Sequence, residues 1–179
     1  MRTLCDSLKN LYPKYHKILN DSFVDLICDI APLHDIGKIT IPDRILIKPD
    51  KLTVFEHNII KQHVAAGGKI ITQIIGDKLK NNRYLKYAKI MALNHHERWD
   101  GLGYPNGLSG TKIPLLGRLM TVVDVYDALI SKRVYKPAFT HNKAVGIIAK
   151  DSGKAFDPEI IKAFISVEDE YRTIGEGCQ

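Results

Sequence analysis

The residues with the clearest chemical potential form two compact groups of histidine and aspartate. The segment HHERWDGLGYP begins at His95 and places two adjacent histidines ahead of a Gly-Tyr-Pro turn. About sixty residues upstream, the segment HDIGK begins with His34 and Asp35. Imidazole and carboxylate together suit iron, manganese or zinc, and the absence of cysteine argues against a structural zinc site. The sequence therefore predicts a metal centre built for chemistry.

Two further residues are candidates for the same centre. His63 has apolar neighbours on an expected helix, where a lone histidine is usually a core residue, but its place between the two groups favours a ligand. Asp124 is surrounded by valines, so we expect it to be buried and either paired or bound to metal. Asp127 lies three residues further on and shares its helix face. A carboxylate can bridge two cations and an imidazole cannot, so Asp35 is the expected bridging ligand.

Helices must position these residues, because no convincing strand pattern is present. Apolar spacing and capping residues predict helices over residues 23–34, 53–76, 83–97, 114–131, 140–152 and 157–164. Thr53 and Glu56 form a capping box, and Pro32 disturbs the end of the first of these helices. Gly67 and Gly68 indicate close backbone packing or a kink. Residues 41–52 are expected to be extended with at most a short helical turn, and residues 99–114 to form a glycine-rich loop.

We therefore expect an all-α bundle of about six to seven helices in a single domain. The domain is expected to span residues 1–166, with a polar, frayed tail over residues 167–179. The 179 residues, 45% hydrophobic and 26% charged, are ordinary for one soluble globular domain. No apolar run reaches the roughly 20 residues that a membrane span needs, and the N-terminus does not resemble a signal peptide. Three scattered cysteines favour a reducing, cytoplasmic location.

The net charge of +6 has two readings. It could attract an anionic partner, or it could arise from lysines that solvate helix faces. The lysines are scattered along the chain, with no arginine-rich tract, which argues against a protein that reads duplex nucleic acid. A small phosphorylated ligand would need only a few of these charges.

Taken together, the ordered motifs resemble the HD-GYP domain, the branch of the HD phosphohydrolase superfamily that degrades cyclic di-GMP. The matching segments extend from about residue 22 to 165 and read LHDIGKITIPDRILIKPDKLT, HHERWDGLGYPNGLSGTKIP, DVYDALISKRVYK and GKAFDP. The resemblance implies an HD-domain helical bundle with a GYP loop. It also implies a metal-dependent phosphodiesterase that hydrolyses cyclic di-GMP to pGpG or GMP in bacterial second-messenger signalling.

The resemblance assigns a role to each matching residue. It implies two or three divalent ions, iron or manganese above all, held by His34, Asp35, His63, His95, His96 and Asp124. Catalysis is assigned to Asp35 and Lys38, and substrate binding to Lys38, Tyr104, Asp127, Arg133 and Lys136. Physical chemistry supports these roles, because two cations about 3.5–4 Å apart both generate a nucleophile at neutral pH and neutralise phosphoryl charge. Arginine offers a planar fork to phosphate, and lysine offers a point charge.

Other residues near the motifs have less specific interpretations. Glu97 could support the adjacent histidines by hydrogen bonding. Trp99 could stack on a base, but anchoring of the loop is the better explanation. His16, His57 and His141 match no family position, and we expect them to be solvated.

The implied partners are cyclic di-GMP, an upstream sensory or receiver domain, a second copy of the chain and a diguanylate cyclase. A different class of function is a module that binds cyclic di-GMP without turnover, and metal occupancy and turnover would separate the two. Hydrolysis of another nucleotide is disfavoured by the GYP motif.

The start of the chain departs from the family pattern. The family's first helix carries a ligand histidine just before an Arg-Thr pair, often with a glutamate one turn earlier. Arg2 and Thr3 match that pair, so the histidine would precede Met1. We expect either a fragment cut within its first helix, which is favoured, or a degenerate member. The site around Asp124 should then hold its metal weakly, and excess Mn²⁺ or Fe²⁺ should recover some turnover.

Overall fold

A computed structural model describes residues 1–76, 81–131 and 138–177 of the chain. Arg133 and Lys136, two of the predicted substrate-binding residues, lie outside the described residues. The α-helices are α1 (Arg2–Leu11), α2 (Asp21–Ile30), α3 (Asp43–Leu46), α4 (Val54–Ile75), α5 (Arg83–Asn94), α6 (Leu115–Ile130), α7 (His141–Lys150), α8 (Pro158–Ile165) and α9 (Glu168–Gly177). Three 3₁₀ segments join them, η1 (Pro13–Tyr15), η2 (Ala31–Thr40) and η3 (Gly110–Lys112). The described residues contain two isolated β-bridges and no strand, so the predicted all-α class is confirmed.

The helix ends follow from local sequence. The predicted capping box of α4 is present, because the Glu56 backbone N–H donates to the Thr53 hydroxyl (3.2 Å) and the Thr53 N–H donates to the Glu56 carboxylate (2.7 Å). The helix over residues 23–34 was predicted too long. It ends at Ile30, because Pro32 cannot continue an α-helix, and the chain goes on as η2.

The described residues contain more helices than the six to seven expected. The four-residue α3 is the short helical turn that was allowed for in residues 41–52, whereas α9 was missed. The expectation of a frayed chain after Ser166 is wrong, because α9 forms there. Its Tyr171 is buried and makes edge-to-face contacts with Tyr126 and Phe164, at centroid distances of 5.0 and 4.8 Å. One buried aromatic side chain thus fixes a helix that is otherwise polar.

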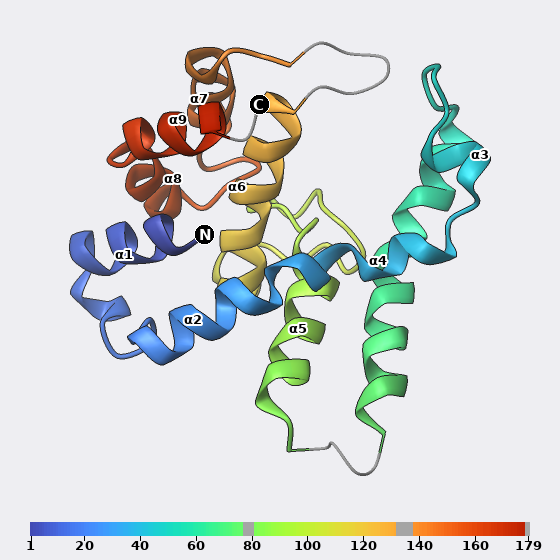
Figure 1. Cartoon of the computed structure of the whole chain (residues 1–179), viewed down its shortest axis with the longest axis horizontal. Coiled ribbons are helices and arrows are strands. Elements are labelled where there is room, and N and C mark those ends of the chain that lie inside the picture. Colours follow the sequence, from blue (N-terminus) through green and yellow to red (C-terminus); the bar gives the residue numbers. More distant parts are fainter. Residues whose placement is uncertain (77–80, 132–137, 178–179) are drawn as a thin grey trace.

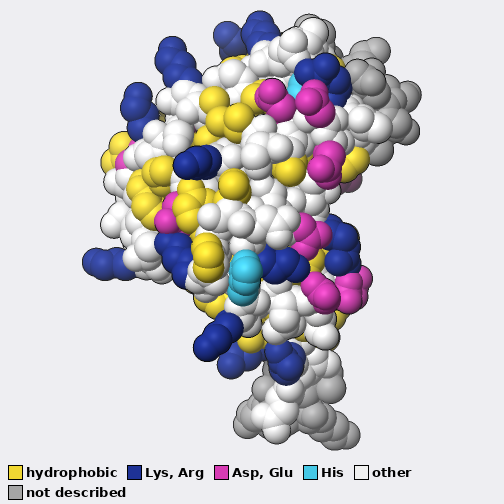
Figure 2. Space-filling view, turned by 90° about the vertical axis from the view of Figure 1, so that its left-hand side faces the viewer, with side chains coloured by type: hydrophobic (Ala, Val, Ile, Leu, Met, Phe, Trp, Pro, Cys, Tyr) yellow, Lys and Arg dark blue, Asp and Glu magenta, His cyan; other side chains and the backbone are white. Residues whose placement is uncertain are grey.

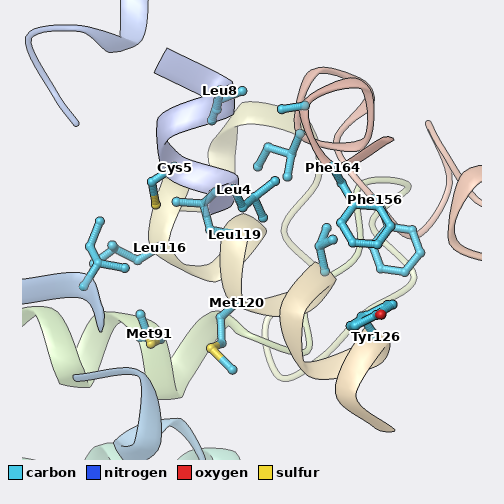
Figure 3. Packing of buried hydrophobic residues seen from close by; sticks show 14 of the residues in the cluster. Leu4, Cys5, Leu8, Met91, Leu116, Leu119, Met120, Tyr126, Phe156 and Phe164 are labelled. Atoms are coloured by element: carbon cyan, nitrogen blue, oxygen red, sulfur yellow. The ribbon is translucent and has the colours of Figure 1, made fainter. Parts of the chain in front are cut away.

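The helices surround one hydrophobic core (Figure 1). Side chains of α1, α6 and α8 interlock there, among them Leu4, Leu8, Leu119 and Phe164, each fully buried (Figure 3). Helices α4 and α5 form an antiparallel pair beside this core (Figure 1). The segment η2 packs across both of them. The core therefore anchors α6 and α5, while η2 brings the HDIGK residues to α4.

A glycine contact fixes η2 against α4. A Cβ atom at Gly37 would lie 1.9 Å from the His63 carbonyl oxygen and 2.5 Å from the Gly67 nitrogen, so only glycine fits. This confirms the predicted close backbone packing at Gly67. The contact sets Asp35, two residues before Gly37, opposite His63.

The surface charges are dispersed on the face that Figure 2 presents. Lysine and arginine side chains stand apart from one another there and are interspersed with acidic and apolar side chains (Figure 2). On this face, the basic side chains are therefore mixed with other types, as the solvating interpretation expects. Within the described ranges, no helix has the length and apolar character that crossing a bilayer requires.

Candidate metal centre

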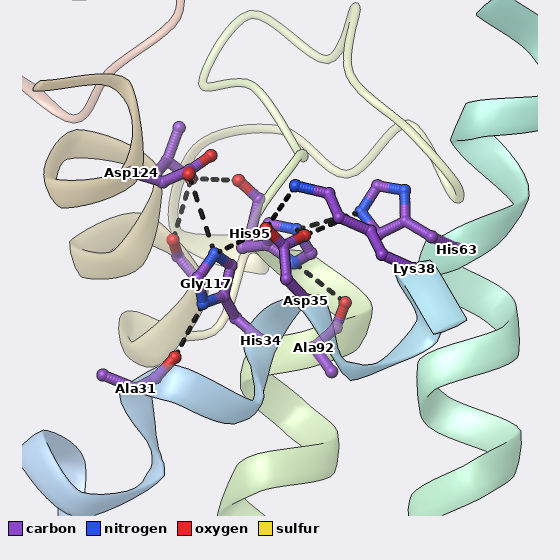
Figure 4. Close-up of polar contacts among 10 residues, drawn as sticks. Ala31, His34, Asp35, Lys38, His63, Ala92, His95, Gly117 and Asp124 are labelled. Carbon is purple, nitrogen blue, oxygen red and sulfur yellow. Dashed lines mark hydrogen bonds and ion pairs between the residues drawn. The ribbon is translucent and has the colours of Figure 1, made fainter. Parts of the chain in front are cut away.

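The six predicted metal ligands converge from four segments of the chain, and Figure 4 labels His34, Asp35, His63, His95 and Asp124 among them. They come from η2, from the middle of α4, from the C-terminal end of α5 and from α6, and they are His34, Asp35, His63, His95, His96 and Asp124. Their ligand atoms fall into two groups, each with all atoms within 4.8 Å of one another. The first group contains Asp35, His63, His95 and His96, and the second contains His34, Asp35 and Asp124.

Backbone carbonyls orient three of the histidine rings. His34 Nδ1 lies 2.6 Å from the Ala31 oxygen, His63 Nδ1 lies 2.6 Å from the Ile60 oxygen, and His95 Nδ1 lies 2.9 Å from the Ala92 oxygen. A carbonyl oxygen can only accept a hydrogen bond, so each Nδ1 carries a hydrogen and donates it. Each Nε2 is therefore the nitrogen that can release its proton and coordinate a cation.

The Nε2 atoms gather around one carboxylate. His63 Nε2 lies 3.4 Å from His95 Nε2 and 3.3 Å from Asp35 Oδ1, and the distance from His95 Nε2 to the same oxygen is 3.7 Å. Donor atoms about 2.1 Å from one cation lie about 3.0–3.4 Å from each other in tetrahedral or octahedral shells. The observed spacing is close to that range, so the donors fit a divalent cation.

Two buried atoms of the ligand groups have no hydrogen bond of normal geometry within the described part of the chain. Five buried side-chain atoms of the described residues share this property, and the two in the centre are His34 Nε2 and Asp35 Oδ1, which both point at other predicted ligands. A buried polar atom without a partner is costly, and a bound cation would satisfy both. This is independent support for a metal site at these side chains.

Asp35 reaches both groups with different oxygens. Its Oδ1 faces His63 and His95, and its Oδ2 lies 3.2 Å from His34 Nε2. His34 Nε2 is 3.6 Å from Asp124 Oδ1. This geometry would let Asp35 bridge two cations, and its bridging role stays a prediction.

Mutual hydrogen bonding sets the charges in the centre. Burial raises the pKa of Asp35, but its close polar contacts with His34, His63, His95 and Lys38 outweigh burial and hold that pKa far below its usual value. Burial lowers the pKa of His34, yet its polar contacts with the Asp124 and Asp35 carboxylates raise it to about 10. Burial and the nearby His95 lower the pKa of His96 to about 3, so His96 is neutral at physiological pH.

Two of the predicted substrate-binding residues, Lys38 and Asp127, lie at different distances from the centre. The Lys38 ammonium forms an ion pair with Asp35 at the partly exposed edge of the centre, with the Lys38 side chain 40% exposed. Asp127 is exposed, three residues along α6 from Asp124, and belongs to neither ligand group. The structure thus brings Lys38 to the centre and leaves Asp127 at the surface.

Tyr104 lies directly over the centre. Its ring stacks on His96 with a centroid distance of 4.8 Å and an interplanar angle of 26°, and the Lys61 ammonium lies 5.2 Å from the ring centroid. Burial raises the pKa of the Tyr104 phenol, and the negative charges of Asp124 and Asp35 raise it further by smaller amounts. The Tyr104–Pro105 peptide bond is cis.

Sequence reasoning missed several contributors. Lys61 has no motif of its own, although its position two residues before His63 was a signal. The Thr121 hydroxyl lies 2.8 Å from both the His95 and the Gly117 carbonyl oxygens and shares its hydrogen between them, which fastens the end of α5 to α6. Such a contact between distant segments leaves no local pattern.

The structure also describes the three histidines expected to be solvated, together with Glu97 and Trp99. His16 and His57 are exposed, as predicted, but His141 is not simply solvated, because its Nδ1 lies 2.8 Å from the Tyr126 hydroxyl. Among the described residues, the Glu97 carboxylate makes no hydrogen bond or ion pair with the histidines. Its carboxylate accepts hydrogen bonds from backbone N–H groups of the following loop. Trp99 anchors that loop through its backbone, donating to Ala155 and accepting from Gly110.

Comparisons with known proteins agree with this geometry. A family model described as an HD domain matches residues 29–160. A cyclic di-GMP phosphodiesterase of Vibrio cholerae serotype O1 is 48% identical over 163 residues, which is 91% of this chain and 33% of that protein. The cyclic di-GMP phosphodiesterase response regulator RpfG of Xanthomonas campestris pv. campestris is 43% identical over 147 residues, covering 82% of this chain and 37% of that protein.

A third relative has a different named substrate. The 3'3'-cGAMP-specific phosphodiesterase 2 of Vibrio cholerae serotype O1 is 38% identical over 170 residues, covering 95% of this chain and 30% of that protein. This chain therefore spans about a third of the length of these relatives. The names of the first two relatives agree with the resemblance to the HD-GYP domain.

Proposed function

This chain belongs to the HD domain family, and we propose that it is a metal-dependent phosphodiesterase that hydrolyses cyclic di-GMP to pGpG or GMP. One observation carries the proposal. Two groups of imidazole and carboxylate donors share Asp35, and its two oxygens face opposite groups. A pair of adjacent cation sites joined by a carboxylate is the arrangement that hydrolysis of a phosphodiester needs.

The residues divide between two sites. Asp35, His63, His95 and His96 would hold one ion, and His34, Asp35 and Asp124 would hold the other. When bound, divalent ions at these sites would lower the pKa of water and offset the negative charge of the phosphoryl group. Imidazole and carboxylate donors without cysteine favour iron or manganese.

The chain's own side chains would orient the substrate. Lys38 lies beside the bridging carboxylate, so its ammonium is available to a phosphate oxygen when an ion neutralises Asp35. Tyr104 offers a ring edge and a hydroxyl next to His96, and Lys61 adds a second positive charge beside that ring. We keep Asp127, Arg133 and Lys136 as predicted contacts to the dinucleotide.

A sensor without turnover is the second candidate, and one observation favours it. The group of His34, Asp35 and Asp124 offers three donors, whereas the other group offers four. Fewer donors imply weaker metal binding, and an underpopulated second site would bind the dinucleotide without cleaving it.

The partners that we propose extend beyond the substrate. One relative is named a response regulator, which supports a receiver domain as a regulatory partner. A second copy of the chain and a diguanylate cyclase remain predictions from the family resemblance. Another relative is named for 3'3'-cGAMP, so that dinucleotide is the competing substrate.

Metal analysis combined with turnover tests the proposal. The protein loaded with Fe²⁺ or Mn²⁺ should hydrolyse cyclic di-GMP faster than 3'3'-cGAMP. His63→Ala should lose metal and activity, because His63 is 1% exposed and aims Nε2 at Asp35. His57→Ala is the matched control, since His57 is exposed on the same helix. Binding of cyclic di-GMP without hydrolysis at saturating metal would favour the sensor instead.

A further inference from the structure

Glu97 follows the His95–His96 pair directly, yet its carboxylate is turned away from the ligand groups. The residue is 1% exposed. One oxygen accepts the Asn106 backbone N–H at 2.8 Å, and the other accepts the Leu108 backbone N–H at 2.9 Å. Among the described residues, no basic side chain forms an ion pair with it. A buried carboxylate held only by two backbone N–H groups is costly to maintain unless those two bonds persist.

The two N–H groups belong to the loop that carries Tyr104. Asn106 and Leu108 flank Gly107, whose φ of 65° turns the chain. On the other side of Tyr104, the loop lies against the backbone of the histidine pair. A Cβ atom at Gly103 would lie 2.6 Å from Glu97 Cα and 2.6 Å from the His96 carbonyl oxygen. The loop therefore folds back on the residues that precede it and is fastened by Glu97 at its far end.

This fastening controls where the Tyr104 ring sits. The Tyr104 N–H donates to the His96 carbonyl oxygen at 3.1 Å, and its ring stacks on the His96 imidazole. Tyr104 lies only two residues before Asn106, so a displacement of Asn106 moves the ring relative to His96. Contact between the ring and a ligand at the centre thus depends on the Glu97 carboxylate.

The chemistry requires a carboxylate at this position. Two N–H donors need two acceptor oxygens, and an ionised glutamate supplies both. A glutamine offers one oxygen and one NH₂ group, so one of the backbone N–H groups would face another donor. The replacement would keep the size of the side chain and lose one of the two bonds.

We propose that Glu97 is a positioning residue, which holds the Gly103–Leu108 loop so that Tyr104 lies over the histidine pair and can receive the substrate. It acts through the loop and does not bind the metal. The substrate part of this inference rests on the proposed function, whereas the tethering part does not.

The first test uses the unmodified protein and needs no substrate. Amide hydrogen exchange should be slow at Asn106 and Leu108 and fast at Gly107, whose N–H has no hydrogen-bond partner within the described chain. Exchange at Asn106 and Leu108 as fast as at Gly107 would overturn the tether, whatever the enzyme hydrolyses.

The second test is Glu97→Gln in the metal-loaded protein. Loss of one charge-assisted hydrogen bond should speed exchange at Asn106 or Leu108 and raise the KM for cyclic di-GMP by about tenfold or more. Metal content and kcat should stay near those of the unmodified protein. Glu56→Gln is the matched control, because Glu56 also accepts a backbone N–H, from Thr53, but lies at the start of α4. Its KM should be unchanged.

The outcomes separate this inference from the proposed function. If the unmodified protein neither binds nor cleaves cyclic di-GMP, the proposed function fails while the exchange data still decide the tether. If Glu97→Gln loosens the loop and leaves KM unchanged, the positioning role is wrong. If the variant loses metal, Glu97 supports the histidines instead, and the inference is overturned.

Discussion

Replacing Gly37 with alanine should separate the two halves of the metal centre. Gly37 lies in η2 between Asp35 and Lys38, and it packs backbone to backbone against α4. The added Cβ would lie 1.9 Å from the His63 carbonyl oxygen, whereas ordinary contact begins at 3.4 Å. The difference, 3.4 minus 1.9, requires η2 to move away from α4 by about 1.5 Å. A flexible side chain cannot absorb this clash, because the opposing atoms are backbone.

The expected cost has two parts. Overpacking of this kind destabilises a protein by about 1–3 kcal/mol, which for a chain of this length lowers Tm by about 2–12 °C. The same movement would lengthen the distance of 3.3 Å between Asp35 Oδ1 and His63 Nε2 toward about 5 Å. Asp35 could then no longer share a cation with His63. The loss in free energy of metal binding should therefore be larger than the loss in free energy of unfolding.

Thermal unfolding by circular dichroism and metal content by mass spectrometry measure the two parts separately. Gly146→Ala is the control. Gly146 lies in α7, and a Cβ atom there would meet nothing within 4 Å, so alanine should stabilise the protein by up to about 1 kcal/mol. A Gly37→Ala protein with unchanged Tm and full metal content would refute the reasoning.

Three further predictions concern stability. Asp157→Ala should cost about 3–5 kcal/mol, because it removes the N-cap of α8 and leaves the nearly buried Arg118 without its carboxylate partner at 2.5 Å; urea unfolding measures this. Tyr171→Ala should cost about 3–5 kcal/mol and Ile174→Ala, at an exposed site on the same helix, less than about 0.5 kcal/mol; equal losses would contradict the packing of α9. Hydrogen bonds from Lys48 and Thr53 lower the pKa of Glu56 to about 2, below its ordinary 4.5, so its contribution is complete above pH 4.5 and disappears as the pH falls through about 2. The Tm difference between the unmodified protein and Glu56→Gln should therefore be constant from pH 7 to 5 and vanish near pH 2.

Local signals were sufficient for most of the helices and for the composition of the site. The Thr53–Glu56 capping box and the Asp157–Pro158 helix start depend on residues three or fewer positions apart, so the sequence displays them directly. The ligand set followed from residue chemistry and motif order. All six predicted ligand residues lie within the two groups, although their metal-binding roles stay predictions.

Contacts between distant segments were beyond local signals. Tyr171 fixes α9 only because Tyr126 and Phe164 are brought beside it by the fold. Glu97 directly follows His95 and His96 in the sequence, so the prediction was that it hydrogen-bonds to those rings. The chain reversal at Gly103 instead presents it with loop N–H groups nine and eleven residues away.

The imidazoles are oriented by a local hydrogen bond that the sequence does not reveal. Each of the three oriented rings bonds to the carbonyl oxygen three residues earlier, as His95 does to Ala92. That spacing is available to any helical histidine, so it predicts nothing alone. It becomes decisive when three such rings face one carboxylate, because each Nδ1 is then committed and each Nε2 is left for a cation.

The two ligand groups differ in burial, so one side of the centre is more open to solvent than the other. His63 and His95 are 1% and 0% exposed, whereas the side chains of His34 and Asp124 are 14% and 25% exposed. Buried donors hold a cation in a medium of low dielectric, where its attraction for a phosphate is strongest. Lys38 pairs with Asp35, and Tyr104 with Lys61 lies beside His96, so two positive charges and an aromatic ring border the centre. An anionic, base-containing ligand can approach only where donors are exposed and charges attract it, so the open edge is where we expect the phosphodiester to enter.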